Sequence, residues 1–138
     1  MIKQVQTALK ISLDTNIWKG ISQNDSRVIE AIGQADKIFI SFIVHAELLY
    51  GFKSGSRFEK NVTILNRFLR SPEVELVHST NETIEIYSEI AKELRQIGKP
   101  IPSNDIWISA LAIETGSSLL TFDKHFSYVP GLRLILKN

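Results

Sequence analysis

Four acidic residues occupy positions where a carboxylate is hard to explain by packing alone. Each ends, opens or interrupts an apolar run, and the four are Asp14, Glu47, Asp105 and Asp123. A buried carboxylate costs free energy unless a positive group neutralises it, and no Lys or Arg adjoins the first three in sequence. If the fold brings the four together, a divalent cation between them would relieve their repulsion. The sequence therefore predicts a metal site with these acids as ligands.

Each acid also has an ordinary explanation. Asp14 could be a helix N-cap, Asp105 could interact with a helix dipole, and Asp123 could be a turn residue. Glu47 is the hardest to explain in this way, because its neighbours in the sequence are almost all apolar. One ion would account for all four acids at once. Their hard oxygen ligands suit Mg²⁺ or Mn²⁺, which can activate water for the cleavage of a phosphodiester.

The three histidines do not form a ligand set. His45 lies two residues before Glu47 and would point away from it on a helix, and His78 ends an expected strand. His125 follows Asp123 closely, but we interpret it as a surface residue. The chain contains no Gly-rich phosphate loop, Ser-His-Asp order or zinc-protease motif.

The composition indicates one folded domain, residues 1–138. The chain is 43% hydrophobic and 22% charged, enough for a core. Its net charge of +1 means that any basic surface must be local. The absence of cysteine excludes disulfides and fits a reducing compartment. Without an apolar span or a signal-like start, we expect a cytoplasmic protein that does not enter a membrane.

Expected strands and helices alternate along the chain. Strands are expected at 9–13, 37–40, 74–77, 118–121 and 132–136. Helices are expected just after Asp14 and at 24–32, 42–50, 55–69, 80–97 and 103–115, with ends at Gly33, Gly51 and Gly116 and caps at Thr80 and Ser103. This order predicts a parallel sheet covered on both faces, which binds ligands at the carboxyl ends of its strands. Two of the acids follow strands there, and Glu47 and Asp105 fall in first helical turns nearby.

Four motifs in this order resemble those of the PIN-domain nucleases, and most closely the VapC-type toxins of toxin–antitoxin pairs. They are LDTN at 13–16, HAELLYG at 45–51, SNDIWISA at 103–110 and LTFDKHF at 120–126. The resemblance runs from Ile11 to the end and includes PGLRL at 130–134. The residues before Ile11 extend beyond the usual start of the family, as an additional strand or a frayed end.

The resemblance implies a three-layer α/β/α PIN-like domain with a central parallel sheet of about five strands. It also implies a Mg²⁺- or Mn²⁺-dependent endoribonuclease that leaves a 5′-phosphate and a 3′-hydroxyl. Asp14 and Asp105 match the principal metal ligands, while Glu47 or Asp123 would position or deprotonate the attacking water. Supporting polar positions of the family are matched by Thr15, Asn16 and Thr121.

The resemblance further implies partners. VapC-type toxins pair with a small VapB-type antitoxin that occupies the active-site groove, and they are usually homodimers. We expect an apolar groove for the antitoxin near helices 42–50 and 58–69.

Five basic residues are candidates for binding RNA phosphates, namely Lys53, Arg57, Lys60, Arg67 and Arg70. A solvated helix face is the ordinary explanation. Trp18 and Trp107 could stack on bases, although apolar neighbours favour core packing for Trp107.

Three other functions compete with the toxin. One is a PIN-domain nuclease for RNA processing that has no antitoxin. Another is a non-catalytic protein-binding module, which predicts no affinity for metal. An aspartyl-phosphate phosphotransferase is disfavoured, because no second Asp lies two residues after Asp14.

Overall fold

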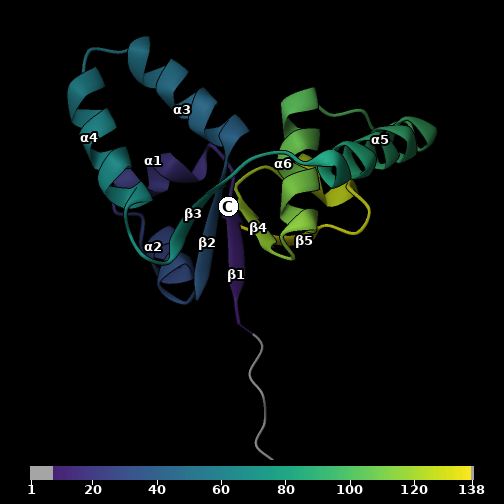
Figure 1. Cartoon of the computed structure of the whole chain (residues 1–138), viewed down its shortest axis with the longest axis horizontal. Helices are drawn as coiled ribbons and strands as arrows, with labels where there is room; N and C mark the ends of the chain where they lie inside the picture. The colour runs from purple at the N-terminus through teal and green to yellow at the C-terminus, as the bar shows by residue number, and fades with distance from the viewer. Residues whose placement is uncertain (1–7, 138) are drawn as a thin grey trace, which may run out of the picture.

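The computed structural model describes residues 8–137, so most of the N-terminal extension lies outside the described residues. Five parallel strands form one sheet in the order β3-β2-β1-β4-β5 (Figure 1). The strands are β1 (Lys10–Leu13), β2 (Lys37–Ser41), β3 (Val74–Val77), β4 (Ser118–Thr121) and β5 (Arg133–Leu136). The first strand in sequence is thus the central strand, as expected when helices cover both faces of a sheet.

Apolar side chains on both faces of the central strands explain why the sheet is buried. Ile11 and Leu13 on β1 are 0% and 3% exposed, and Leu119 and Leu120 on β4 are both fully buried. Continuous apolar runs of this kind favour a parallel strand over a half-exposed antiparallel one.

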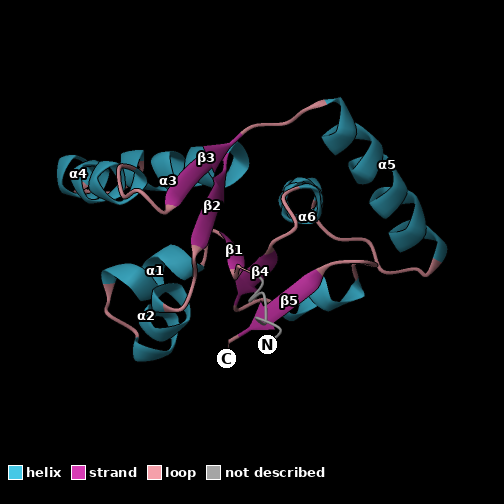
Figure 2. Ribbon diagram, turned by 60° about the horizontal axis from the view of Figure 1, so that its bottom comes forward, coloured by secondary structure: helices cyan, strands magenta, loops and turns pink. Residues whose placement is uncertain are grey.

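Helices pack on both sides of this sheet (Figure 2). They are α1 (Ile17–Ser22), α2 (Ser26–Gly33), α3 (Phe42–Lys53), α4 (Phe58–Leu69), α5 (Asn81–Gln96), α6 (Ser103–Glu114) and the 3₁₀ helix η1 (Lys124–Tyr128). Helices α1, α2, α3 and α4 lie on one side of the sheet, where Trp18 of α1 packs against Phe52 of α3 and Phe68 of α4, and α5 and α6 lie on the other side. This arrangement confirms the three-layer α/β/α fold. None of the helices in the described part of the chain is long and apolar enough to cross a membrane.

Several expected element boundaries are wrong. Gly51 does not end α3, which continues to Lys53. Gly51 does not adopt the positive φ with which a glycine commonly ends a helix. Gly116 does have a φ of 68° and follows the end of α6, as its role in a C-terminal turn requires. Helix α4 begins at Phe58, three residues later than expected. The η1 helix was not expected, since five residues are too few to show a helical period.

The two helices that carry acids begin in different ways. The Ser41 side chain accepts a hydrogen bond from Val44 N at 3.1 Å, so α3 starts directly at the carboxyl end of β2. Helix α6 has Pro102 at its N-cap, and Ser103 is its first helical residue rather than the expected cap. Asp105 therefore lies in the first turn of α6, near the positive end of the helix dipole.

Candidate active site

The register of β1 against β4 places Asp14 beside Thr121. Leu13 pairs with Leu120, and Asp14, which follows β1, donates its backbone N–H to Leu120 O at 3.0 Å. Thr121 Oγ1 then donates to Asp14 Oδ2 at 2.6 Å, and Thr15 N donates to Asp14 Oδ1 at 2.8 Å. Asp14 is only 6% exposed, so these bonds fix a buried carboxylate at the carboxyl edge of the sheet.

Asn16, rather than Asp14, occupies the N-cap position of α1, so the helix-cap explanation of Asp14 is wrong. The Asn16 amide connects the ends of the two central strands. Its Nδ2 donates to Thr121 Oγ1 at 3.5 Å, and its Oδ1 accepts a bond from Phe122 N at 3.3 Å. The polar positions drawn from the resemblance therefore lie around the Asp14 carboxylate.

Glu47 reaches the same edge from α3. Thr15 Oγ1 donates to Glu47 Oε1 at 2.7 Å, and the Glu47 residue is partly buried. Glu47 is the sixth residue of α3 and thus lies in its second turn, not in the first turn as expected. Thr15 consequently contacts two acids, one through its backbone and one through its hydroxyl.

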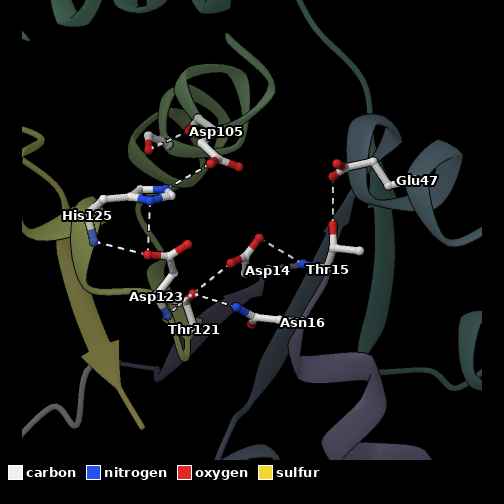
Figure 3. Close-up of polar contacts among 9 residues, drawn as sticks. Asp14, Thr15, Asn16, Glu47, Asp105, Thr121, Asp123 and His125 are labelled. Carbon is white, nitrogen blue, oxygen red and sulfur yellow. Dashed lines mark hydrogen bonds and ion pairs between the residues drawn. The ribbon is translucent and has the colours of Figure 1, made fainter. Parts of the chain in front are cut away.

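His125 bridges the two remaining acids, as Figure 3 shows. Its Nδ1 lies 2.9 Å from Asp123 Oδ1, and its buried Nε2 lies 2.8 Å from Asp105 Oδ2 without the geometry of a good hydrogen bond. The His125 side chain is 28% exposed, so its interpretation as a surface residue is wrong. Asp123 Oδ1 also accepts from His125 N at 3.2 Å, which caps η1. The position of His125 two residues after Asp123 was the feature of the sequence that could have indicated its place in the site.

Burial and mutual repulsion change how the acids titrate. Burial raises the pKa of Asp14 to about 6. The hydrogen bonds from Thr121 and Thr15 lower this pKa, and the nearby charges of Asp105 and Glu47 raise it further. Burial is also the main cause that raises the pKa of Asp105, while His125 opposes the rise. A carboxylate pKa raised in this way indicates a place where positive charge would be stabilising.

The donor set fits a hard divalent cation in charge and chemistry. The four carboxylates come from the end of β1, from α3, from α6 and from the end of β4, and His125 forms ion pairs with two of them, Asp105 and Asp123. Mg²⁺ and Mn²⁺ prefer such oxygen ligands. Among the described residues, however, no three acidic or histidine side chains already stand in positions to share an ion.

The five candidate RNA-binding residues are all exposed, and their binding of RNA stays a prediction. Lys53 ends α3, Arg57 precedes α4, and Lys60 lies in the first turn of α4. The last two, Arg67 and Arg70, lie at the opposite end of α4.

Both tryptophans pack against other rings. Trp18 is 7% exposed and lies between Phe52 and Phe68, with ring centroids 6.4 and 5.6 Å away, so it is not available to stack on a base. Trp107 is partly buried and stacks on Tyr87 at 4.1 Å.

An apolar groove was expected near α3 and α4, but the hollow found there is lined mainly by polar residues of 56–60. An apolar groove lies between α5 and α6 and is lined by Ile86, Ile90 and Ile113, with Glu89 and Glu93 beside them. The antitoxin groove near α3 and α4 stays a prediction.

Comparison with known proteins identifies the class to which this fold and site belong. The family model described as "PIN domain" matches residues 11–132. The chain therefore belongs to the PIN-domain family.

Its relatives within that family are VapC ribonucleases. The chain is similar to Ribonuclease VapC2 of Rickettsia felis, at 34% identity over 80% of each chain. It is also similar to Ribonuclease VapC1 of Haemophilus influenzae, at 29% identity over 88% of this chain and 92% of the relative. The crystal structure of VapBC2 from Rickettsia felis bound to a DNA fragment from their promoter superposes with a TM-score of 0.81. Identity there is 30%, with 93% of this chain and 98% of the other covered. The resemblance drawn from the four motifs is thus confirmed.

Removing the Thr121 hydroxyl should disturb the site more than the fold. In Thr121→Val, Asp14 loses a hydrogen bond that lowers its pKa, and the backbone N–H of Asp123 loses its acceptor. We expect RNA cleavage to fall about 10-fold or more, at a stability cost of about 1–3 kcal/mol. The rise of activity with pH should also shift to higher pH, which loss of packing alone would not cause. Thr63→Val, an exposed change on α4 of the same shape, is the control. An unshifted pH profile would contradict this role for Thr121.

Proposed function

We propose that this chain is a metal-dependent endoribonuclease and the toxin of a type II toxin–antitoxin pair. The observation that carries the proposal is the convergence of Asp14, Glu47, Asp105 and Asp123 at the carboxyl edge of the sheet. Its relatives are ribonucleases by name, which supports RNA as the substrate. We place the activity in the cytoplasm, where cellular RNA is available, and assign it to a single domain of residues 1–138.

The acids divide into two roles. Asp14 and Asp105 would hold Mg²⁺ or Mn²⁺, because these two carboxylates are the acids whose pKa is raised by burial. When bound, the ion supplies positive charge for the transition state and lowers the pKa of the attacking water. Glu47, held by the Thr15 hydroxyl, and Asp123, held by His125, would orient that water and accept its proton.

The supporting residues fix these acids before substrate arrives. Thr121 and Asn16 hold the end of β4 against the end of β1, and Thr15 links Asp14 to Glu47. Because these groups are already in place, the enzyme does not spend free energy on reorienting them when the transition state forms. In-line attack on phosphorus then leaves a 5′-phosphate and a 3′-hydroxyl.

We further propose that the protein works as a homodimer and is held inactive by a small VapB-type antitoxin. The Rickettsia felis structure to which this chain is similar is a VapBC2 complex on DNA from its promoter, which supports an antitoxin partner for this chain. An antitoxin bound across the acidic edge would exclude RNA.

Expression in a bacterial host tests the toxin proposal. Induced wild-type protein should arrest growth within a few generations, and Asp105→Asn at equal expression should not. Co-expression of a small DNA-binding protein encoded beside the gene should restore growth. Growth arrest that persists in Asp105→Asn would contradict a toxic nuclease. Arrest by the wild type that no neighbouring protein relieves would favour an RNA-processing nuclease without an antitoxin.

A further inference from the structure

Helix α3 presents an exposed aromatic ring close to the acidic site. Tyr50 is 75% exposed, the largest value among the exposed large hydrophobic residues in the described part of the chain. A single exposed ring is ordinary on a protein surface, so its position decides whether it has a function. Tyr50 lies three residues after Glu47 and therefore on neighbouring positions of one helix face.

The general geometry of an α-helix places the Tyr50 ring beside the turn that carries Glu47. Side chains on an α-helix tilt toward its N-terminus, so the Tyr50 ring leans over the turn that carries Glu47. A Cβ atom placed on the adjacent Gly51 would meet no atom within 4 Å. The 75% exposure of Tyr50 itself leaves its ring open to a flat ligand such as a nucleobase.

Positive charge continues outward from this ring. Within residues 50–60 there are three cations, Lys53, Arg57 and Lys60, against one anion, Glu59. All three cations are exposed, and Lys53 lies one turn beyond Tyr50 on the same helix. In a chain whose net charge is only +1, this is a local excess that suits a phosphate backbone.

A surface hollow lies at the tip of the hairpin formed by α3 and α4. It has a volume of about 530 Å³ and is lined by Ser56, Arg57, Phe58, Glu59 and Lys60. This volume is within the range of about 300–1,000 Å³ typical of small-ligand sites. In this hollow Phe58 supplies an aromatic ring, and Arg57 and Lys60 supply two cations. Such side chains bind a base and its phosphates.

We propose that Tyr50, Lys53, Arg57 and Lys60 form a distal subsite for single-stranded RNA that leads away from the cleaved bond. Tyr50 stacks on a base near the scissile phosphate, and the three cations hold the following phosphates up to the hollow. This inference rests on the proposed ribonuclease function. The excess of positive charge favours RNA over an apolar protein segment as the occupant, because phosphates need cations and an apolar segment does not.

RNA binding by the full-length protein tests the distal subsite. The probe is a short single-stranded RNA of mixed sequence with a 5′ fluorophore, titrated in chelator so that it stays intact. Fluorescence anisotropy gives the Kd at several salt concentrations. The variants are Tyr50→Ala, Tyr50→Phe and Lys53→Gln. The matched control is Ile84→Ala, which removes an exposed apolar side chain, 51% exposed, from α5 on the other side of the molecule. Thermal melting confirms that each variant is folded.

Stacking and charge predict different signatures. Tyr50→Ala should weaken binding about 5- to 100-fold with the salt dependence unchanged, and Tyr50→Phe should bind as the wild type does. Lys53→Gln should instead reduce the slope of log Kd against log salt by about 0.7, the value for one phosphate contact on a single strand. Ile84→Ala should change neither quantity.

The outcomes separate the distal subsite from the nuclease proposal. If the wild type cleaves RNA with Mn²⁺ but Tyr50→Ala binds RNA normally, the subsite is overturned and the nuclease stands. If Tyr50→Ala loses antitoxin affinity and keeps RNA affinity, the surface belongs to the protein partner and the subsite is likewise overturned. A wild type that neither binds nor cleaves RNA overturns both proposals.

Discussion

Replacing Asp105 with Asn should abolish RNA cleavage and leave a folded protein. Asp105 is partly buried in the first turn of α6 and contacts His125, and an amide of the same shape removes only its charge. Changes to residues that merely support metal ligands cost about 10- to 100-fold, so loss of a ligand should exceed about 100-fold. The measurement is the rate of RNA cleavage in Mn²⁺ under single-turnover conditions.

A binding measurement separates loss of metal from loss of structure in this variant. Calorimetric titration with Mn²⁺ should show weaker binding to Asp105→Asn than to the wild type, while the melting temperature without metal should not fall. Glu75→Gln, on the exposed edge strand β3, removes one negative charge away from the site and is the control. Full cleavage by Asp105→Asn would remove this residue from the proposed machinery.

Replacing Asp14 with Asn should abolish cleavage but stabilise the metal-free protein at neutral pH. Burial is the main cause that raises the pKa of Asp14 from 3.8 to about 6. Folding therefore favours the protonated acid. That favourable contribution is present below pH 3.8 and is lost as pH rises through about 6. A difference of about 2 pH units at about 1.4 kcal/mol per unit corresponds to at most about 3 kcal/mol.

The pH dependence gives this second prediction its sign. The free energy of unfolding of Asp14→Asn should exceed that of the wild type most clearly at pH 7–8 in chelator. The advantage should shrink as pH falls from 6 to 4, because the wild-type carboxyl becomes neutral. Added Mn²⁺ should stabilise the wild type more than the variant, which narrows the difference at pH 7–8. A variant less stable than the wild type at every pH would show that the Asp14 charge is already compensated within the fold.

The three-layer architecture could be predicted from the sequence because the expected strands are apolar on both faces. Ile11 and Leu13, or Leu119 and Leu120, leave no polar face, and such strands require helices on both sides. Asp14 and Asp123 each follow such a strand, which placed them at the carboxyl edge of the sheet. The errors arose where a residue has two common uses. Gly51 continues its helix although glycine often ends one, and Phe58 starts α4 after a turn whose length no local pattern specifies.

The parts of the site that sequence reasoning missed depend on contacts between distant elements. His125 contacts Asp105, twenty residues earlier, because η1 follows β4 directly and returns toward α6. That short helix has no periodicity to predict, so the orientation of its side chain was also hidden. Thr121 was expected as a supporting residue, but its bond to Asp14 could not be foreseen, because it depends on the register of β1 against β4. Trp18 was undecided, because only the folded protein shows the two phenylalanines that enclose it.

The measurement that tests the central claim most directly is cleavage of total cellular RNA by purified, antitoxin-free protein. The reactions contain Mn²⁺, Mg²⁺ or chelator, with Asp105→Asn in parallel, and the fragment ends are sequenced. The account predicts cuts at discrete positions, with 5′-phosphate and 3′-hydroxyl ends, that vanish in chelator and in the variant. Folded wild-type protein that cuts no RNA with either metal, or cuts equally well in chelator, would contradict it.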